Sequence, residues 1–300
     1  MKQLFLNVSD GSAQAKYTAN SKTPTALNKV EVLVATINQE NFSIVEQMNI
    51  RTDAVIANQS DKCGYAEMEI DSKIIKMVST NTKGAGINRN MAIAYSTGDV
   101  LLFADDDVVY EDNYEDIILS AFRDQPTADV IMFNFDVLKK GKIVTARETR
   151  IKRLRLYNAL KYGTIRIAIK RNSLLKSNLH FFDSFGPGCK YNMNEDALFI
   201  IDCLNKGLKL YAYPGYLGST VKDTSSWFRG FDEKFWYNKG AFVAAAFPGF
   251  QRLLIIYFLW RFRNSNEITF NNRIKHILNG VRGYAKQLSY DEYYEHISKE

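Results

Sequence analysis

Apolar runs alternate with helical patterns through the first 135 residues of the chain. Runs rich in β-branched residues are typical of buried strands and occur at 30–36, 53–58, 74–78, 99–104 and 128–135. Helical segments lie between several of them, at 42–49, 86–95 and 113–123, the last with Asn113 as its N-cap. Strands that alternate with helices predict an α/β fold with a Rossmann-like, mainly parallel central sheet flanked by helices.

The second half of the chain has a less regular pattern. It predicts strands at 164–169 and 208–213, a Gly-Pro-Gly turn at 186–188 and a helix at 194–206. Beyond Trp227 the sequence is aromatic and helix-like. The apolar run 241–260 is interrupted by Pro248 and Gly249, so it is a poor transmembrane span. It fits either a helix lying on a membrane surface or a helix packed in the core.

These patterns divide the chain into three parts. Residues 1–28 are a polar lead-in without the apolar core of a signal peptide, residues 29–220 form the α/β domain, and residues 221–300 form a helical, basic and aromatic extension. Cys63, Cys189 and Cys203 are too far apart and too few for a disulfide framework or a zinc site. We therefore expect a cytoplasmic protein.

Basic charge is concentrated in two segments. Residues 139–176 hold 13 basic residues and one acid, Glu148, and residues 251–286 hold seven and one, Glu267. The whole chain carries only +6, so the remainder is acidic, with a net charge of −12. The basic segments suit phosphates, an anionic membrane or an acidic glycan, or are solvated helix faces. Because no recognised nucleic-acid-binding module accompanies them, nucleic acid is not an expected partner.

The strand at 99–104 leads into three consecutive carboxylates, Asp105, Asp106 and Asp107. Ligands of open α/β sheets bind at the carboxyl ends of the strands. Three adjacent carboxylates repel one another unless a cation relieves them. Their oxygen atoms suit Mn²⁺ or Mg²⁺ bridging to a diphosphate, with Asp107 and Asp105 as candidate ligands. The alternative is a solvated acidic turn.

Two further motifs flank this turn. Upstream, a Gly-x-Gly loop opens the helix at 86–95 and carries Lys83 and Arg89, which suit a nucleotide phosphate or base. Downstream, Glu195 and Asp196 fall in the first turn of the helix at 194–206, where acids gain from the helix dipole. Simple capping of that helix, with Asn194 as the cap, explains the two acids equally well on spacing alone.

As a set and in this order, the motifs resemble those of family 2 glycosyltransferases. They are the strand end at 36–40, the Lys-Gly loop with its Arg-Asn, the Asp-Asp-Asp turn and Asn-Glu-Asp. The resemblance covers roughly residues 30–213 and is closest to bacterial enzymes that build capsular or other surface polysaccharides. It implies a GT-A fold and a metal-dependent, inverting transfer of a sugar from a nucleoside-diphosphate sugar.

The resemblance also implies roles for residues of this chain. Thr36 would lie beside the base, Lys83 near the nucleotide, and Asp106 near the ribose or donor sugar. Asp107 would hold the metal.

In the Glu195–Asp196 pair, Asp196 would be the base that takes the proton of the acceptor hydroxyl. The family usually has an aspartate after the second strand to bind the base of the nucleotide, where this chain has Asn58 and Gln59. An amide can pair with uracil, so a UDP-sugar is the favoured donor.

The C-terminal extension suits the acceptor side of the reaction. Residues 225–236 combine aromatic side chains for sugar faces with Arg229 and Lys234 for a pyrophosphate, as expected of an acceptor lid, although aromatic core packing fits as well. The acceptor would be a glycan or a lipid-linked molecule. For a lipid-linked acceptor, the basic and apolar C-terminal helices would contact the anionic inner face of the membrane.

Other classes of protein fit less well. Asp105-x-Asp107 also matches haloacid-dehalogenase-type phosphatases, in which the first aspartate is the nucleophile, but their motif follows the first strand of the fold. A nucleotidyltransferase should have a Gly-rich basic loop after its first strand, and residues 36–40 have neither feature. A non-catalytic glycan- or membrane-binding protein that retains the fold remains an alternative.

Overall fold

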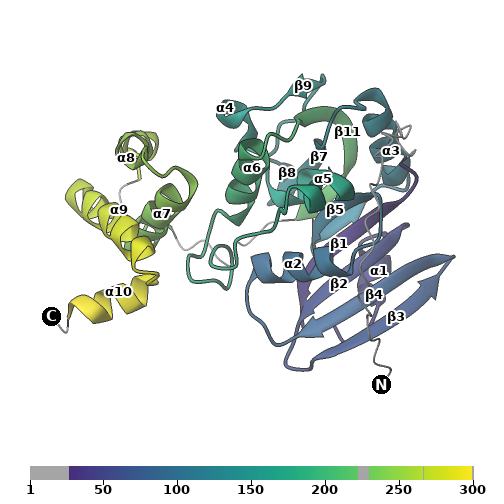
Figure 1. The fold of residues 1–300 in the computed structure, drawn as a ribbon, viewed down its shortest axis with the longest axis horizontal. Coiled ribbons are helices and arrows are strands. Elements are labelled where there is room, and N and C mark those ends of the chain that lie inside the picture. The colour runs from purple at the N-terminus through teal and green to yellow at the C-terminus, as the bar shows by residue number, and fades with distance from the viewer. Residues whose placement is uncertain (1–26, 222–229, 266, 299–300) are drawn as a thin grey trace, which may run out of the picture.

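The computed structural model describes residues 27–221, 230–265 and 267–298. The predicted lead-in therefore lies almost entirely outside the described residues. An α/β body extends to the last strand, and four further helices gather at the other end of the molecule (Figure 1).

The centre of the sheet is parallel. Its four strands pair in the order β4-β2-β1-β5, all parallel. Their bounds are β1 (Val30–Ile37), β2 (Asp53–Gln59), β4 (Lys73–Thr80) and β5 (Val100–Asp105). Each coincides with a predicted strand. Their carboxyl ends meet at one edge, where Ala35 of β1 pairs with Asp105 of β5.

Antiparallel pairings surround this centre. β10 (Ile167–Lys170) runs antiparallel between β5 and β7 (Val130–Lys139), and β11 (Leu210–Val221) is parallel to β7. Strands missing from the sequence prediction complete the sheet: β3 (Gly64–Ile70), β6 (Val108–Tyr110), β8 (Lys142–Ile143) and β9 (Lys152–Arg153). The strand predicted at 164–169 starts only at Ile167, because Thr164–Arg166 form a 3₁₀ turn.

Helices cover both faces of the sheet. The alternation along β1 is clear: Val32 and Val34 enter one core, whereas Leu33 enters the other. The helices of the body are α1 (Ser43–Gln47), α2 (Ala85–Tyr95), α3 (Tyr114–Asp124), α4 (Leu156–Ala159), α5 (Arg171–Lys176) and α6 (Glu195–Asn205). Asn113 precedes α3 as predicted, but its side chain makes no capping hydrogen bond.

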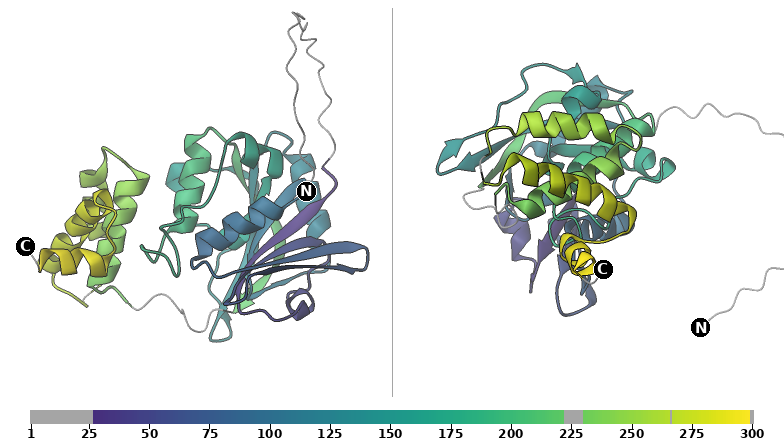
Figure 2. Two further views of the ribbon diagram at one scale, coloured as in Figure 1. Left: turned by 60° about the horizontal axis from the view of Figure 1, so that its bottom comes forward. Right: turned by 90° about the vertical axis from the view of Figure 1, so that its left-hand side faces the viewer.

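The C-terminal helices form a third core that includes one face of α6. They are α7 (Glu233–Ala246), α8 (Gln251–Arg261), α9 (Phe270–Ala285) and α10 (Tyr290–Ile297), and Figure 2 shows them as one group. The apolar run 241–260 is divided between α7 and α8. In the described ranges, no helix is long and apolar enough to cross a membrane. Leu198 and Ile201 of α6 share the third core with Trp236, which joins the extension to the body.

Glycines allow α7 and α9 to approach closely. A Cβ on Gly240 would lie 2.0 Å from the carbonyl oxygen of Ile277, and a Cβ on Gly280 would lie 1.9 Å from that of Tyr237. Backbone atoms cannot move aside as the end of a side chain can. The helix pair therefore requires glycine at these two positions.

We expect Gly280→Ala to lower the free energy of unfolding by about 2–3 kcal/mol, because the added methyl group forces the two helices apart. Urea denaturation measures this change. The control is Gly64→Ala in β3, where an added Cβ meets no atom within 4 Å. Equal stability of the two variants would contradict the close packing of α7 on α9.

Candidate active site

The aspartate turn lies at the carboxyl edge of the parallel strands, as predicted. Asp105 ends β5, and Asp106 and Asp107 form the exposed turn into β6. The Thr36 hydroxyl at the end of β1 donates a hydrogen bond to Asp106 Oδ2 over 2.6 Å. This bond joins two of the motifs that the sequence singled out.

A buried arginine joins the aspartate turn to the Asn-Glu-Asp motif. Arg89 of α2 donates to Asp105 Oδ1 over 2.7 Å and to Glu195 Oε1 over 3.1 Å. Its side chain is 5% exposed, against 31% for Asp105 and 12% for Glu195. Burial favours the neutral form of Arg89, but the two carboxylates outweigh burial and raise its pKa above the ordinary value. Arg89 therefore joins the aspartate turn to a carboxylate that lies 106 positions after Arg89 itself.

The repulsion expected among the three aspartates is thus largely relieved within the protein. Arg89 pairs with Asp105 and Thr36 binds Asp106. Over the described part of the chain, no three His, Cys, Asp or Glu side chains form a cluster that could hold a metal ion by themselves. A divalent ion at this turn would depend on Asp107 together with oxygen atoms of a bound diphosphate, which is a usual arrangement for Mg²⁺.

Asp196 differs from Glu195 in its surroundings. One of its carboxyl oxygens, Oδ1, accepts the backbone N–H of Ala197 over 2.7 Å, and Oδ2 faces Gly163. Burial and the neighbouring Glu195 raise the pKa of Asp196 to about 6, although the Ala197 N–H and Arg89 act in the opposite direction. A carboxylate of this pKa is ionised at neutral pH and is a stronger proton acceptor than an ordinary aspartate.

Asn194 occupies the N-cap position of α6 but does not cap the helix with its side chain. It has a left-handed backbone with φ of 67°, and its side chain makes no capping hydrogen bond. Instead, Asn194 Oδ1 accepts a hydrogen bond from Lys239 of α7 over 2.9 Å. The simple capping explanation of this motif is therefore wrong for Asn194.

Asn58 is engaged within the protein. Its side-chain amide donates to the Gln39 carbonyl and to Ser79 Oγ, both over 2.9 Å, and its Oδ1 accepts the Gln39 N–H. Gln39 in turn donates to Thr36 Oγ1 over 3.1 Å. Asn58 thus shapes the loop after β1, and both of its donors are already used. Its contact with a nucleotide base stays a prediction.

The Gly-x-Gly loop packs against the turn at 186–188. The Ala85 N–H donates to the Pro187 carbonyl over 3.0 Å, and the Gly84 N–H donates to Gln59 Oε1 over 3.0 Å. Both amides therefore already have partners within the protein. The loop sequence alone had suggested that they could bind a phosphate. Lys83 is exposed beside them.

The predicted acceptor lid falls partly outside the described residues, which exclude Arg229. In the part that the structure describes, Phe235 and Trp236 are buried in the third core. Lys234 pairs with Asp291 of α10 over 2.8 Å. These two aromatic side chains have the core-packing role that was the alternative to a lid.

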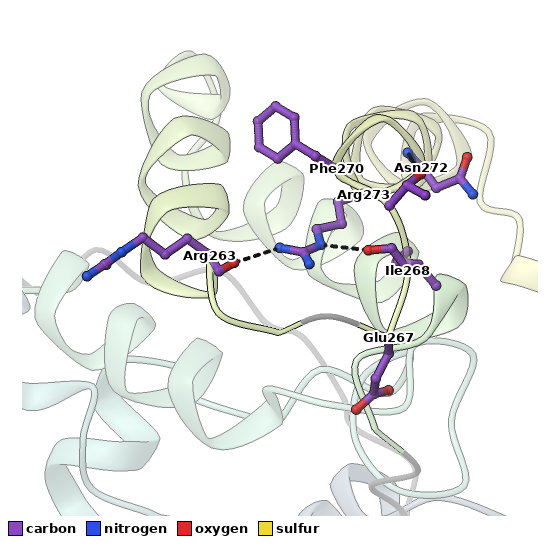
Figure 3. Close-up of a pocket in the computed structure, with 7 residues that line it drawn as sticks. Arg263, Glu267, Ile268, Phe270, Asn272 and Arg273 are labelled. Atoms are coloured by element: carbon purple, nitrogen blue, oxygen red, sulfur yellow. Dashed lines mark hydrogen bonds between the residues drawn. The ribbon is translucent and has the colours of Figure 1, made fainter.

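A surface hollow of about 640 Å³ lies between the end of α8 and the start of α9 (Figure 3). Arg273 lies in it and donates to the carbonyl groups of Ile268, Phe262 and Arg263 over 3.2–3.3 Å. The guanidinium group thus binds carbonyl groups of the segment that connects α8 to α9. The hollow is a feature of this connection. It holds none of the motif residues.

Comparison with known proteins agrees with this arrangement. Residues 49–182 match the family model described as Glycosyl transferase family 2. This segment includes the Lys-Gly loop and the aspartate turn. No curated protein sequence matches the chain.

Solved structures of the S. aureus protein TarS have a similar fold. TarS 1–349 in complex with UDP-GlcNAc has a TM-score of 0.55 and 15% identity, over 88% of this chain and 77% of that one. The same fragment in complex with UDP has a TM-score of 0.57 and 15% identity, over 87% and 83%.

The fold is thus the GT-A fold. The segment 49–182 is similar to family 2 glycosyltransferases. Both the fold class and the resemblance predicted from the motifs are confirmed.

Replacing the buried arginine tests the link between the motifs. We expect Arg89→Met to lower the free energy of unfolding by about 3 kcal/mol, because Asp105 and Glu195 lose their shared partner. The control is Arg51→Met, whose ion pair with Asp112 joins side chains 57% and 76% exposed. That variant should lose no more than about 1 kcal/mol. Urea denaturation distinguishes the two, and equal losses would contradict a special role of Arg89.

Proposed function

We propose that this protein is an inverting glycosyltransferase that moves a sugar from a UDP-sugar to a hydroxyl group of a glycan or lipid-linked acceptor in bacterial surface polysaccharide synthesis. The observation that carries the proposal is the Arg89 bridge. It places the aspartate turn and the Glu195–Asp196 pair in one constellation, at the sheet edge where α/β folds bind ligands.

Asp196 is the base in this proposal. The acceptor oxygen attacks the anomeric carbon while its proton passes to the Asp196 carboxylate. The bond from that carbon to the diphosphate breaks, and UDP leaves with the bonding electrons. A single displacement from the opposite side inverts the anomeric centre.

The remaining motif residues bind and position. Thr36 fixes the orientation of Asp106, which would contact the ribose or the donor sugar, and the exposed Lys83 would approach the nucleotide. Arg89 and Glu195 act through each other, so both hold the site together instead of touching the donor.

Asp107 would hold Mn²⁺ or Mg²⁺, which would neutralise charge on the leaving diphosphate. The Asp107 carboxylate lies on an exposed turn. The neighbouring Asp106 is held in place by its hydrogen bond from Thr36.

Uridine is the proposed nucleotide. TarS, which shares the fold, is seen with UDP and with UDP-GlcNAc. Because Asn58 uses its amide donors inside the protein, recognition of uracil would depend on the loop that Asn58 holds, including the backbone near Gln39. This explains how an asparagine can stand where the family has an aspartate.

Two aspartate variants separate donor binding from catalysis. We expect wild-type protein to bind UDP more tightly with Mn²⁺ than without it, and Asp107→Asn to lose this difference. Asp196→Asn should bind UDP normally but turn over UDP-sugars at least about 100-fold more slowly, since it has no base. Calorimetry and UDP release measure the two properties. If no nucleoside diphosphate binds, the proposal fails and a non-catalytic binding protein becomes the better explanation.

We further propose that α8 lies on the surface of an anionic membrane. Leu253, Ile256, Tyr257 and Trp260 follow the i, i+3, i+4, i+7 spacing of one helix face, and each is 48–67% exposed. No other described part of the protein covers these four side chains.

Charge supports a lipid surface as the occupant of this face. Arg252, Arg261 and Arg263 are exposed on or next to α8, and Arg263 lies 5.0 Å from the ring of Trp260. Apolar side chains flanked by arginines and an interfacial tryptophan are typical of helices at a lipid surface. A membrane-bound enzyme would then meet a lipid-linked acceptor.

Vesicle sedimentation tests the membrane proposal. We expect binding to vesicles rich in phosphatidylglycerol at low salt, little binding to phosphatidylcholine, and a loss of about tenfold or more in the variant Leu253→Ser/Ile256→Ser. The control is Leu278→Ser on α9, which is also exposed. A wild-type protein that stays in the supernatant, or forms dimers that the double variant abolishes, would overturn the assignment of lipid to this face.

A further inference from the structure

A buried lysine of the extension reaches the base motif of the body. Lys239 of α7 is 6% exposed, although lysine is almost never buried without a partner. Its ammonium group donates to Asn194 Oδ1 over 2.9 Å. Asn194 is the residue immediately before Glu195 and Asp196.

Aromatic rings surround the rest of the ammonium group. The ring centroids of Phe235, Phe242, Phe258 and Phe262 lie 5.1–6.0 Å from Lys239 Nζ. Ring faces attract a cation but do not replace the water that burial removes. Burial therefore lowers the pKa of Lys239 to about 8, and Asp196 opposes this effect by favouring the charged form.

The contact acts on a strained part of the backbone. Asn194 has φ of 67°, a conformation that costs energy for any residue except glycine. The direction in which α6 starts, and hence the position of Asp196, depends on this residue. A hydrogen bond from a residue fixed in the third core holds Asn194 in place.

We propose that Lys239 is a positioning residue for the base: its ammonium group holds Asn194, and its charge favours the ionised form of Asp196. The inference rests on the proposed role of Asp196 as the base. The C-terminal extension would thus act on the base, a role different from the acceptor binding that the sequence predicted for it.

The charges around Lys239 define what a pH profile should show. Asp196 of α6 favours the charged form of Lys239, and the neighbouring Glu195 is paired with Arg89. The other groups around the ammonium are the four phenylalanine rings. Activity should rise as Asp196 loses its proton near pH 6, and fall as Lys239 loses its proton near pH 8.

Two substitutions separate charge from volume. Lys239→Met keeps the apolar stem but removes the charge and the donor, and it should not lower the melting temperature, because a buried charge is replaced by an apolar group. We expect kcat to fall about tenfold or more, with the donor KM changed less than about twofold. Lys239→Arg keeps the charge and donors, so it should retain most activity and lose the alkaline decline. The control is Lys206→Met, which removes a lysine paired with Asp202 near the C-terminal end of α6.

A direct measurement does not depend on turnover. Carbon-13 NMR titration of the Asp196 carboxyl group, assigned with Asp196→Asn, should show its midpoint raised by about half a unit or more in Lys239→Met, because a nearby positive charge is lost. An unchanged midpoint together with wild-type kcat would overturn the inference. If wild-type protein turns over no nucleotide sugar, the proposed function fails, and the titration still decides whether Lys239 acts on Asp196.

Discussion

The site depends on one buried guanidinium group. Arg89 binds Asp105 at the end of a strand and Glu195 at the start of a helix. A buried charge with only one of these partners would be costly, so the two motifs and the helix that carries Arg89 must come together at once. The geometry around Asp107 and Asp196 follows from this requirement, because Asp196 directly follows Glu195 and Asp107 lies two residues after Asp105.

The body and the extension depend on each other in a similar way. The third core packs α6 against α7, and α7 can lie against α9 only because Gly240 and Gly280 have no side chains. Lys239 precedes Gly240 directly, so the helix contact that needs glycine also fixes the direction of the lysine. The packing of the extension is thereby transmitted to Asn194.

Hydrophobic pattern predicted the parallel centre of the sheet well, because strands such as Val30–Ile37 are buried on both faces and read as continuous apolar runs. It missed β3, which exposes most of its residues and so has no apolar face to recognise. Motif order singled out Asp105 to Asp107 and Asp196, and the structure links the two motifs through Arg89, while the roles of these aspartates stay predictions. Motif order could not show that Arg89 binds both Asp105 and Glu195, because this depends on tertiary packing. Lys239 lies 45 residues from its partner Asn194, and no spacing rule connects them.

The glycine of the Lys-Gly loop has one more consequence. A Cβ on Gly84 would lie 2.5 Å from Cys189 Sγ, so this sulfur occupies the space that the missing side chain leaves. Burial raises the pKa of Cys189 to about 11, and the group therefore stays a protonated, weakly reactive thiol at neutral pH. The side chain is only partly exposed, so alkylation should speed up when the two loops separate. The reactivity of this thiol is thus a natural reporter of how often the Lys-Gly loop separates from the turn at 186–188.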